Sequence, residues 1–207
     1  MKKKLWLSSI AFVFASILLV GQVDAENTTT YTVQPGDSMW KVAIRFEVGV
    51  TEIMKSNPQI TNPNLIYPGQ KLQIPQYDEV KKLEYEVVQL VNQERAKHGL
   101  KPLIADWELS RVARFKSADM RDLNYFDHNS PTYGSPFTMI QNFGLTYRSA
   151  AENIAAGQTD AQSVMKAWMN SPGHRQNILN PNLTHIGCGY AQGGKWGHYW
   201  TQMFILK

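Results

Sequence analysis

The sequence of 207 residues predicts an α+β protein, and three observations carry that prediction. Apolar residues within 161–168 recur at positions i, i+3, i+4 and i+7, which is the spacing of an amphipathic helix. Residues 185–190 and 199–204 alternate as strands on either side of a Gly-Gly pair, which predicts a β-hairpin. Residues 31–75 form a separate short unit with strand, helix, helix and strand signals. Several helices around a small antiparallel sheet define the α+β class.

The first 25 residues have the pattern of a secretory signal. Three lysines, Lys2 to Lys4, precede an apolar stretch from Leu5 to Val20, and small residues follow before Ala25. This order predicts export with cleavage after Ala25. The alternative is an uncleaved anchor, but about 16 mostly apolar residues are fewer than the roughly 20 that span a bilayer. We therefore expect a secreted protein with no stable membrane anchor after cleavage.

The charge of the chain excludes one class of partner. Removing Lys2, Lys3, Lys4 and Asp24 from the 21 basic and 17 acidic residues leaves a net charge of +2. Proteins that bind nucleic acid need a basic face for phosphate contacts, and no such excess remains. We expect no nucleic-acid partner.

The short unit from 31 to 75 contains clear capping and stop signals. Ser38 can cap a helix that includes Phe46, and Thr51 can cap a second helix that runs to Ser56. Pro58 disfavours helical geometry in the preceding residue, so the second helix must end there. The predicted strands are 31–34 and 71–74.

A polar linker is predicted at 76–83, before a second unit that starts with helix signals. One apolar face comprises Val87, Val88, Leu90 and Val91, and Gly99 ends that helix. Asp106 can cap another helix, with apolar positions at Leu109, Val112, Ala113 and Met120. Ile154 and Ala155, near Glu152, indicate a third strand. The single cysteine, Cys188, falls on a strand face with Ile186 and Tyr190, so a buried packing thiol is expected rather than a nucleophile.

Three polar residues of the second unit are candidates for chemistry. His128 lies in a loop after a helix, His174 lies where an amphipathic helix ends, and Glu152 is a carboxylate in an apolar run. A carboxylate in such a run is rarely buried without a partner. The three could form a structural hydrogen-bonded cluster, a zinc site with open positions or an acid/base set. These alternatives stay open, with zinc as the possible cofactor.

The first unit resembles a LysM domain. The resemblance lies in Tyr31 to Trp40 (YTVQPGDSMW), in Asn57-Pro58 and in Tyr67 to Leu72 (YPGQKL), and it covers nearly all of 31–75. It implies a βααβ fold that binds N-acetylglucosamine glycans such as peptidoglycan or chitin. The implied glycan-binding residues are Gly36, Asp37, Ser38, Met39, Asn57, Pro58, Gln59 and Ile60.

The second unit, 84–207, resembles bacterial members of the CAP superfamily (cysteine-rich secretory proteins, antigen 5 and pathogenesis-related 1 proteins). The segments that carry the resemblance are 90–95, His128 before Ser130-Pro131, 151–155, 168–175 and 199–202. It implies an α-β-α sandwich whose cavity contains two histidines and two acidic residues. His128 and Glu152 match two of these positions, whereas Ser171 and Tyr199 occupy the other two. His174 is the candidate replacement.

These resemblances together predict a secreted protein associated with the cell wall. The LysM domain would bind peptidoglycan, and the CAP domain would have an extracellular role that is not enzymatic. One alternative is a metal-dependent hydrolase, peptidase or wall-modifying enzyme that uses His128, Glu152 and His174. Another is a protein of spore coat or cortex assembly at the spore surface.

Overall fold

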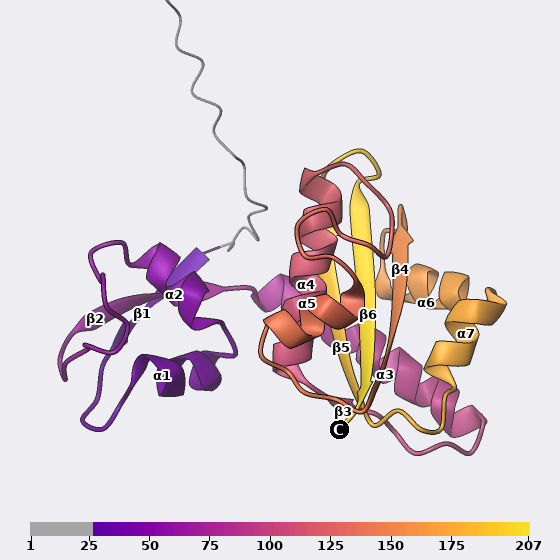
Figure 1. Ribbon diagram of the computed structural model, residues 1–207, viewed down its shortest axis with the longest axis horizontal. Helices are drawn as coiled ribbons and strands as arrows, with labels where there is room; N and C mark the ends of the chain where they lie inside the picture. Colours follow the sequence, from indigo (N-terminus) through magenta and orange to yellow (C-terminus); the bar gives the residue numbers. More distant parts are fainter. Residues whose placement is uncertain (1–26) are drawn as a thin grey trace, which may run out of the picture.

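The computed structural model describes residues 27–207, so the predicted signal peptide lies outside the described residues. Two domains follow one another along the chain, and Figure 1 shows them joined by the start of a long helix, α3 (Asp78–Lys97). Between Asn27 and Lys207 no helix is both long and apolar enough to cross a membrane.

The first domain has the order β1 (Asn27–Thr32), α1 (Met39–Phe46), α2 (Val50–Ser56) and β2 (Lys71–Gln76). The two strands pair antiparallel, and the two helices cover them over a small apolar core. The Ser38 hydroxyl accepts a hydrogen bond from the backbone N–H of Lys41 (3.3 Å), so the predicted cap of α1 is confirmed.

The predicted cap of α2 is wrong. The helix begins at Val50, its N-cap residue is Gly49, and no side chain caps it. The Thr51 hydroxyl instead donates to Glu52 Oε2 (2.6 Å) and accepts from Arg111 Nη2 of the second domain (2.9 Å). The Thr51 hydroxyl, which the local sequence predicts as the cap of α2, therefore bonds to Glu52 and to Arg111 of the second domain instead.

Residues predicted as a linker are ordered secondary structure at the domain junction. They comprise the last residue of β2, Tyr77 and the first six residues of α3. Lys81 Nζ donates to the carbonyl of Phe46 (2.9 Å), and the Arg111 guanidinium pairs with the Glu52 carboxylate. The two domains are therefore in direct polar contact as well as linked by the chain.

The second domain is built on a four-stranded sheet in the order β3-β5-β6-β4, over Ile104–Ala105, His185–Gln192, His198–Leu206 and Ser149–Ala156. Strands β5 and β6 form the predicted antiparallel hairpin, and β4 pairs antiparallel with β6. The third strand inferred near Glu152 is therefore confirmed. The short strand β3 is parallel to β5.

Helices cover both faces of this sheet (Figure 1). One face packs against α3, α6 (Ala161–Met169) and α7 (Pro172–Ile178). The other packs against α4 (Trp107–Asp122) and α5 (Pro136–Asn142). The predicted helix from 161 and the predicted Asp106 cap are both confirmed, since Asp106 Oδ1 accepts from Leu109 N (3.0 Å). The result is the expected α-β-α sandwich.

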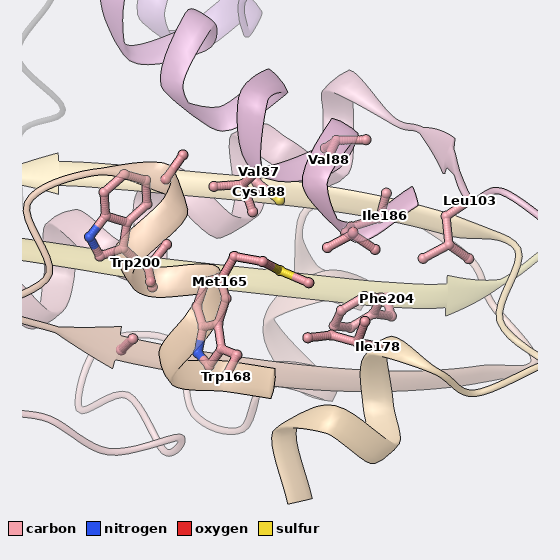
Figure 2. Close-up of a cluster of buried hydrophobic side chains, with 14 of the residues drawn as sticks. Val87, Val88, Leu103, Met165, Trp168, Ile178, Ile186, Cys188, Trp200 and Phe204 are labelled. Atoms are coloured by element: carbon pink, nitrogen blue, oxygen red, sulfur yellow. The ribbon is translucent and has the colours of Figure 1, made fainter. Parts of the chain in front are cut away.

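The face under α3 and α6 is an apolar core (Figure 2). Trp168 is 1% exposed, and its indole N–H donates to the carbonyl of Ile154 (3.2 Å). Cys188 lies on the strand face predicted for it, buried with Ile186 and Tyr190. The amphipathic patterns of 87–91 and 161–168 meet here.

Two glycines let α4 lie directly on the opposite face. A Cβ atom at Gly187 would collide with the backbone of Leu109 and Ser110, and one at Gly189 would collide with the backbone of Ala113 and Arg114. Strand β5 therefore alternates between glycine toward α4 and larger apolar side chains toward α3. This close approach fixes the position of the polar residues of α4 relative to the sheet.

Candidate functional site

Strand β4 directs two neighbouring polar residues to opposite faces of the sheet. Side chains alternate along a strand, so Glu152 shares its face with Ile154, which packs against Met120 of α4. Asn153 points to the other face, where its Nδ2 donates to Gln202 Oε1 (3.0 Å) and to the carbonyl of His174 on α7 (3.1 Å). The alternation decides which candidates can meet.

His128 and Glu152 form a direct pair. His128 Nδ1 lies 2.6 Å from Glu152 Oε1, and the side chains are 53% and 2% exposed, respectively. The hydrogen bond to the carboxylate raises the pKa of His128, and burial raises the pKa of Glu152. Glu152 Oε2 has no hydrogen-bond partner among residues 27–207. The pair thus presents an imidazole to solvent and a buried carboxylate with a free oxygen.

A fully buried lysine, Lys116 of α4, holds the loop that carries His128. Its ammonium group donates to the carbonyls of Asp127 (2.7 Å) and His128 (2.9 Å) and to the Tyr125 hydroxyl (3.1 Å). Burial lowers the pKa of Lys116, and the charge of Glu152 opposes that shift. Sequence reasoning missed this residue, although Lys116 falls on the apolar stripe of Val112, Ala113 and Met120, where a charge is unexpected.

Asp119, one helical turn beyond Lys116, binds the same loop through three hydroxyl groups. Its carboxylate accepts from Tyr125, Ser130 and Thr132, each at 2.6 Å. Burial, followed by the hydrogen bond to Asp119, raises the pKa of Tyr125, so that its hydroxyl remains a donor. The loop is therefore fixed to α4 by one buried cation and one buried anion.

His174 is on α7, and its backbone carbonyl accepts a hydrogen bond from Asn153 Nδ2 on strand β4. Within the described chain the His174 ring makes no hydrogen bond to either His128 or Glu152, and burial followed by the charge of His128 lowers its pKa. The structure brings together His128 and Glu152, but it does not join His174 to them. Within 27–207, no group of three or more His, Cys, Asp or Glu side chains is placed to hold a metal ion.

Ser171 and Tyr199, which occupy the other two cavity positions of the CAP resemblance, have structural surroundings of their own. Ser171 precedes α7 as its N-cap residue and makes no side-chain capping bond. Tyr199 is fully buried beside Met120 and Ile154. Neither position supplies an acid or an imidazole to the pair.

The predicted glycan-binding residues of the first domain divide into two groups. Met39, Asn57 and Ile60 are buried, and Asn57 ties α2 to β2 through hydrogen bonds with the backbone of Ile53 and Gln73. Asp37 accepts from the Tyr31 hydroxyl (2.5 Å) and the backbone N–H of Gln34 (2.8 Å). These residues shape the loops. The exposed ones are Gly36, Ser38, Pro58 and Gln59.

The fold and the His128–Glu152 pair define a class of protein: a small βααβ domain followed by an α-β-α sandwich with one imidazole–carboxylate pair at a sheet edge. The family models agree with this description. Residues 31–75 match the LysM domain, and residues 88–204 match the CAP family, described as the cysteine-rich secretory protein family. The chain belongs to the CAP family and has an N-terminal LysM domain.

Similar proteins match parts of the chain. A 124-residue segment is 61% identical to the uncharacterized protein YkwD of Bacillus subtilis (strain 168), covering 60% of this chain and 47% of that protein. A 45-residue segment is 42% identical to the spore coat assembly protein ExsA of Bacillus cereus, covering 22% of this chain and 7% of ExsA. The chain spans less than half the length of either relative.

A solved structure shows the same fold. It is an extracellular protein of Bacillus anthracis (str. Ames) with an SCP domain, which is 35% identical with a TM-score of 0.58 over 68% of this chain and 47% of that one. Together, the LysM and CAP domains support an extracellular protein associated with the cell wall.

Proposed function

We propose that the LysM domain tethers this protein to peptidoglycan, through the exposed loop residues Gly36, Ser38, Pro58 and Gln59. The observation that carries the proposal is that some of the predicted glycan-binding residues are buried and hold the loops, whereas the others are exposed. Buried Asn57 fixes the backbone of one loop through three hydrogen bonds, which leaves neighbouring Pro58 and Gln59 exposed. A loop held rigid in this way presents its polar groups without an ordering cost on binding.

A pulldown with insoluble peptidoglycan tests the tether. The protein without residues 1–25 should sediment with the wall, and Gln59→Ala should increase the unbound fraction. Gln176→Ala is the matched control, because Gln176 is an exposed glutamine on α7 whose side chain makes no hydrogen bond within 27–207. A wild-type protein that stays in the supernatant would refute the tether. Binding should change little with salt, because residues 26–77 carry four basic and four acidic side chains and attraction steered by charge needs a net charge.

The CAP domain, in this proposal, has a non-enzymatic extracellular role. Support comes from the site itself: one histidine and one carboxylate are paired, Ser171 and Tyr199 stand at the other two positions, and no hydrogen bond within 27–207 joins the His174 ring to the pair. Incubation of the protein with purified peptidoglycan should release no soluble fragments detectable by mass spectrometry.

A hydrolase is the second candidate, and one observation favours it. Glu152 has a raised pKa and a free buried oxygen beside an exposed imidazole, an arrangement that suits proton transfer. Fragments that appear with the wild type and disappear with both His128→Ala and Glu152→Gln would establish this function in place of the non-enzymatic one.

A role in spore coat or cortex assembly is a further proposal on location. Its support is the LysM-length match to a protein named for spore coat assembly. In a sporulating host, a fluorescent fusion should concentrate around the forespore. A uniform signal along the vegetative cell wall would argue for a general wall protein instead.

A further inference from the structure

A groove of about 180 Å³ opens where the two domains meet. Trp40 and Thr51 line it from the LysM domain, and Trp107, Glu108, Arg111 and Phe143 line it from the CAP domain. Trp40 is 56% exposed, so a large aromatic ring borders the opening. Neither domain forms this groove alone, since each contributes one wall.

The groove contains hydrogen-bonding groups without protein partners. The buried indole N–H groups of Trp168 and Trp200 each donate to a backbone carbonyl. In contrast, the indoles of Trp40 and Trp107 find no acceptor between Asn27 and Lys207, and the Glu108 carboxylate there accepts no hydrogen bond. Two donors and one acceptor therefore remain available to a ligand.

The cation in the groove is already neutralised. Arg111 donates to Thr51 Oγ1 (2.9 Å) and to Glu52 Oε2 (2.7 Å), and its guanidinium lies over the rings of Phe115 and Phe143 (5.2 and 5.1 Å). A phosphate or carboxylate would have to compete with Glu52 for this group. The groove thus suits a neutral ligand with an apolar surface and a few polar substituents.

We infer that this groove binds one pyranose ring of an N-acetylglucosamine glycan; the inference rests on the tether proposed above. The C–H face of a pyranose can pack on an indole, its acetamido carbonyl can accept from an indole N–H, and its hydroxyl or acetamido N–H can donate to Glu108. The volume is smaller than that of drug-sized sites, which hold several rings.

The position of Trp40 connects the groove to the LysM loops. Trp40 directly follows Met39, the last residue of the predicted glycan-binding loop at Gly36 to Met39. Two subsites on one glycan strand bind more tightly than either alone, because the second contact is intramolecular. The junction would therefore extend the glycan site of the LysM domain onto the CAP domain.

Indole N–H signals in nuclear magnetic resonance spectra test the inference directly. Five tryptophans follow residue 25. On titration of the protein without residues 1–25 with chitotetraose, the Trp40 and Trp107 signals should shift, whereas those of buried Trp168 and exposed Trp196 should not. If the Gln59 amide shifts and Trp107 does not, the groove inference is overturned and the tether stands. If neither shifts, both fail.

Affinity measurements with variants separate binding from folding. Trp107→Ala should weaken chitotetraose binding about three- to tenfold by calorimetry. Trp196→Ala is the matched control and should leave affinity unchanged. Glu108→Ala removes an unpaired carboxylate from the first turn of α4 without opening the core, so it should weaken binding in a protein that still unfolds cooperatively. Wild-type affinity in both groove variants would overturn the inference.

Discussion

The two faces of the CAP-domain sheet are filled by different chemistry. The face under α3 and α6 is apolar, with Trp168, Cys188 and Phe204 packed at 2% exposure or less. The face under α4 ends, at the β4 edge, in a polar network around Lys116 and Glu152. Both layers contain buried apolar side chains, but only the polar end of the α4 layer, at the β4 edge, costs stability to hold an imidazole beside a buried carboxylate.

The largest effect is expected on the apolar face. Trp168→Ala should lower the free energy of unfolding by about 3–5 kcal/mol, because a fully buried indole leaves a cavity and its hydrogen bond to Ile154 is lost. Urea denaturation followed by circular dichroism measures it. Trp196→Ala, at a site 37% exposed, should change stability by less than about 1 kcal/mol. Equal losses would contradict the assignment of this face as the core.

A smaller loss is expected on the polar face. Lys116→Met keeps most of the side-chain length but removes three hydrogen bonds, two of them to loop carbonyls. The expected cost is about 2–3 kcal/mol, since buried acceptors are left unpaired.

The position of His128 provides the specific readout for that variant. Without the ammonium group the loop should no longer hold the imidazole at Glu152. Loss of the hydrogen bond to Glu152 lowers the pKa of His128 by more than loss of the Lys116 charge raises it, so this pKa should fall in a histidine titration by nuclear magnetic resonance. An unchanged pKa in a folded Lys116→Met protein would show that Lys116 does not position His128.

The third prediction concerns the charge of the pair. Glu152→Gln should lower the pKa of His128, because the carboxylate raises it and burial opposes that rise. In the wild type a raised folded-state pKa means that the native protein binds the proton more tightly than the unfolded chain. The stabilisation is therefore complete below about pH 6.5 and declines as pH rises through the raised value.

Burial raises the pKa of Glu152, so the contribution of Glu152 to stability also declines as pH rises. Denaturation curves at several pH values should show the stability difference between wild type and Glu152→Gln shrinking as pH increases. A difference that grows with pH would contradict the pairing of a charged imidazole with this carboxylate.

The smallest effect is expected at Cys188. Burial raises the pKa of the Cys188 thiol well above its usual value, so it should not react with a thiol reagent in the native protein. The same reagent in guanidinium chloride should label one thiol per chain. Rapid labelling of the native protein would show that the apolar face opens more readily than its packing implies.

The sequence by itself determined the local elements whose signals are short in range. The Ser38 and Asp106 caps, the hairpin around Gly193-Gly194 and the amphipathic helix at 161–168 all depend on neighbours within about one or two turns. Glu152 was recognisable for the same reason, because a carboxylate within an apolar strand needs a partner. Residues 31–75 were recognisable because almost the whole LysM motif is contiguous.

Only the tertiary structure decided which polar residues meet. Alternation along β4 sends Glu152 toward α4 and Asn153 toward α7, so His128 reaches the carboxylate and His174 does not. Lys116 and Asp119 gain their roles from a loop that returns to α4, and the Thr51 hydroxyl is drawn from its helix by Arg111, 60 residues away. Such partners are set by how the chain packs, because free energy depends on distance in space, which spacing along the sequence does not encode.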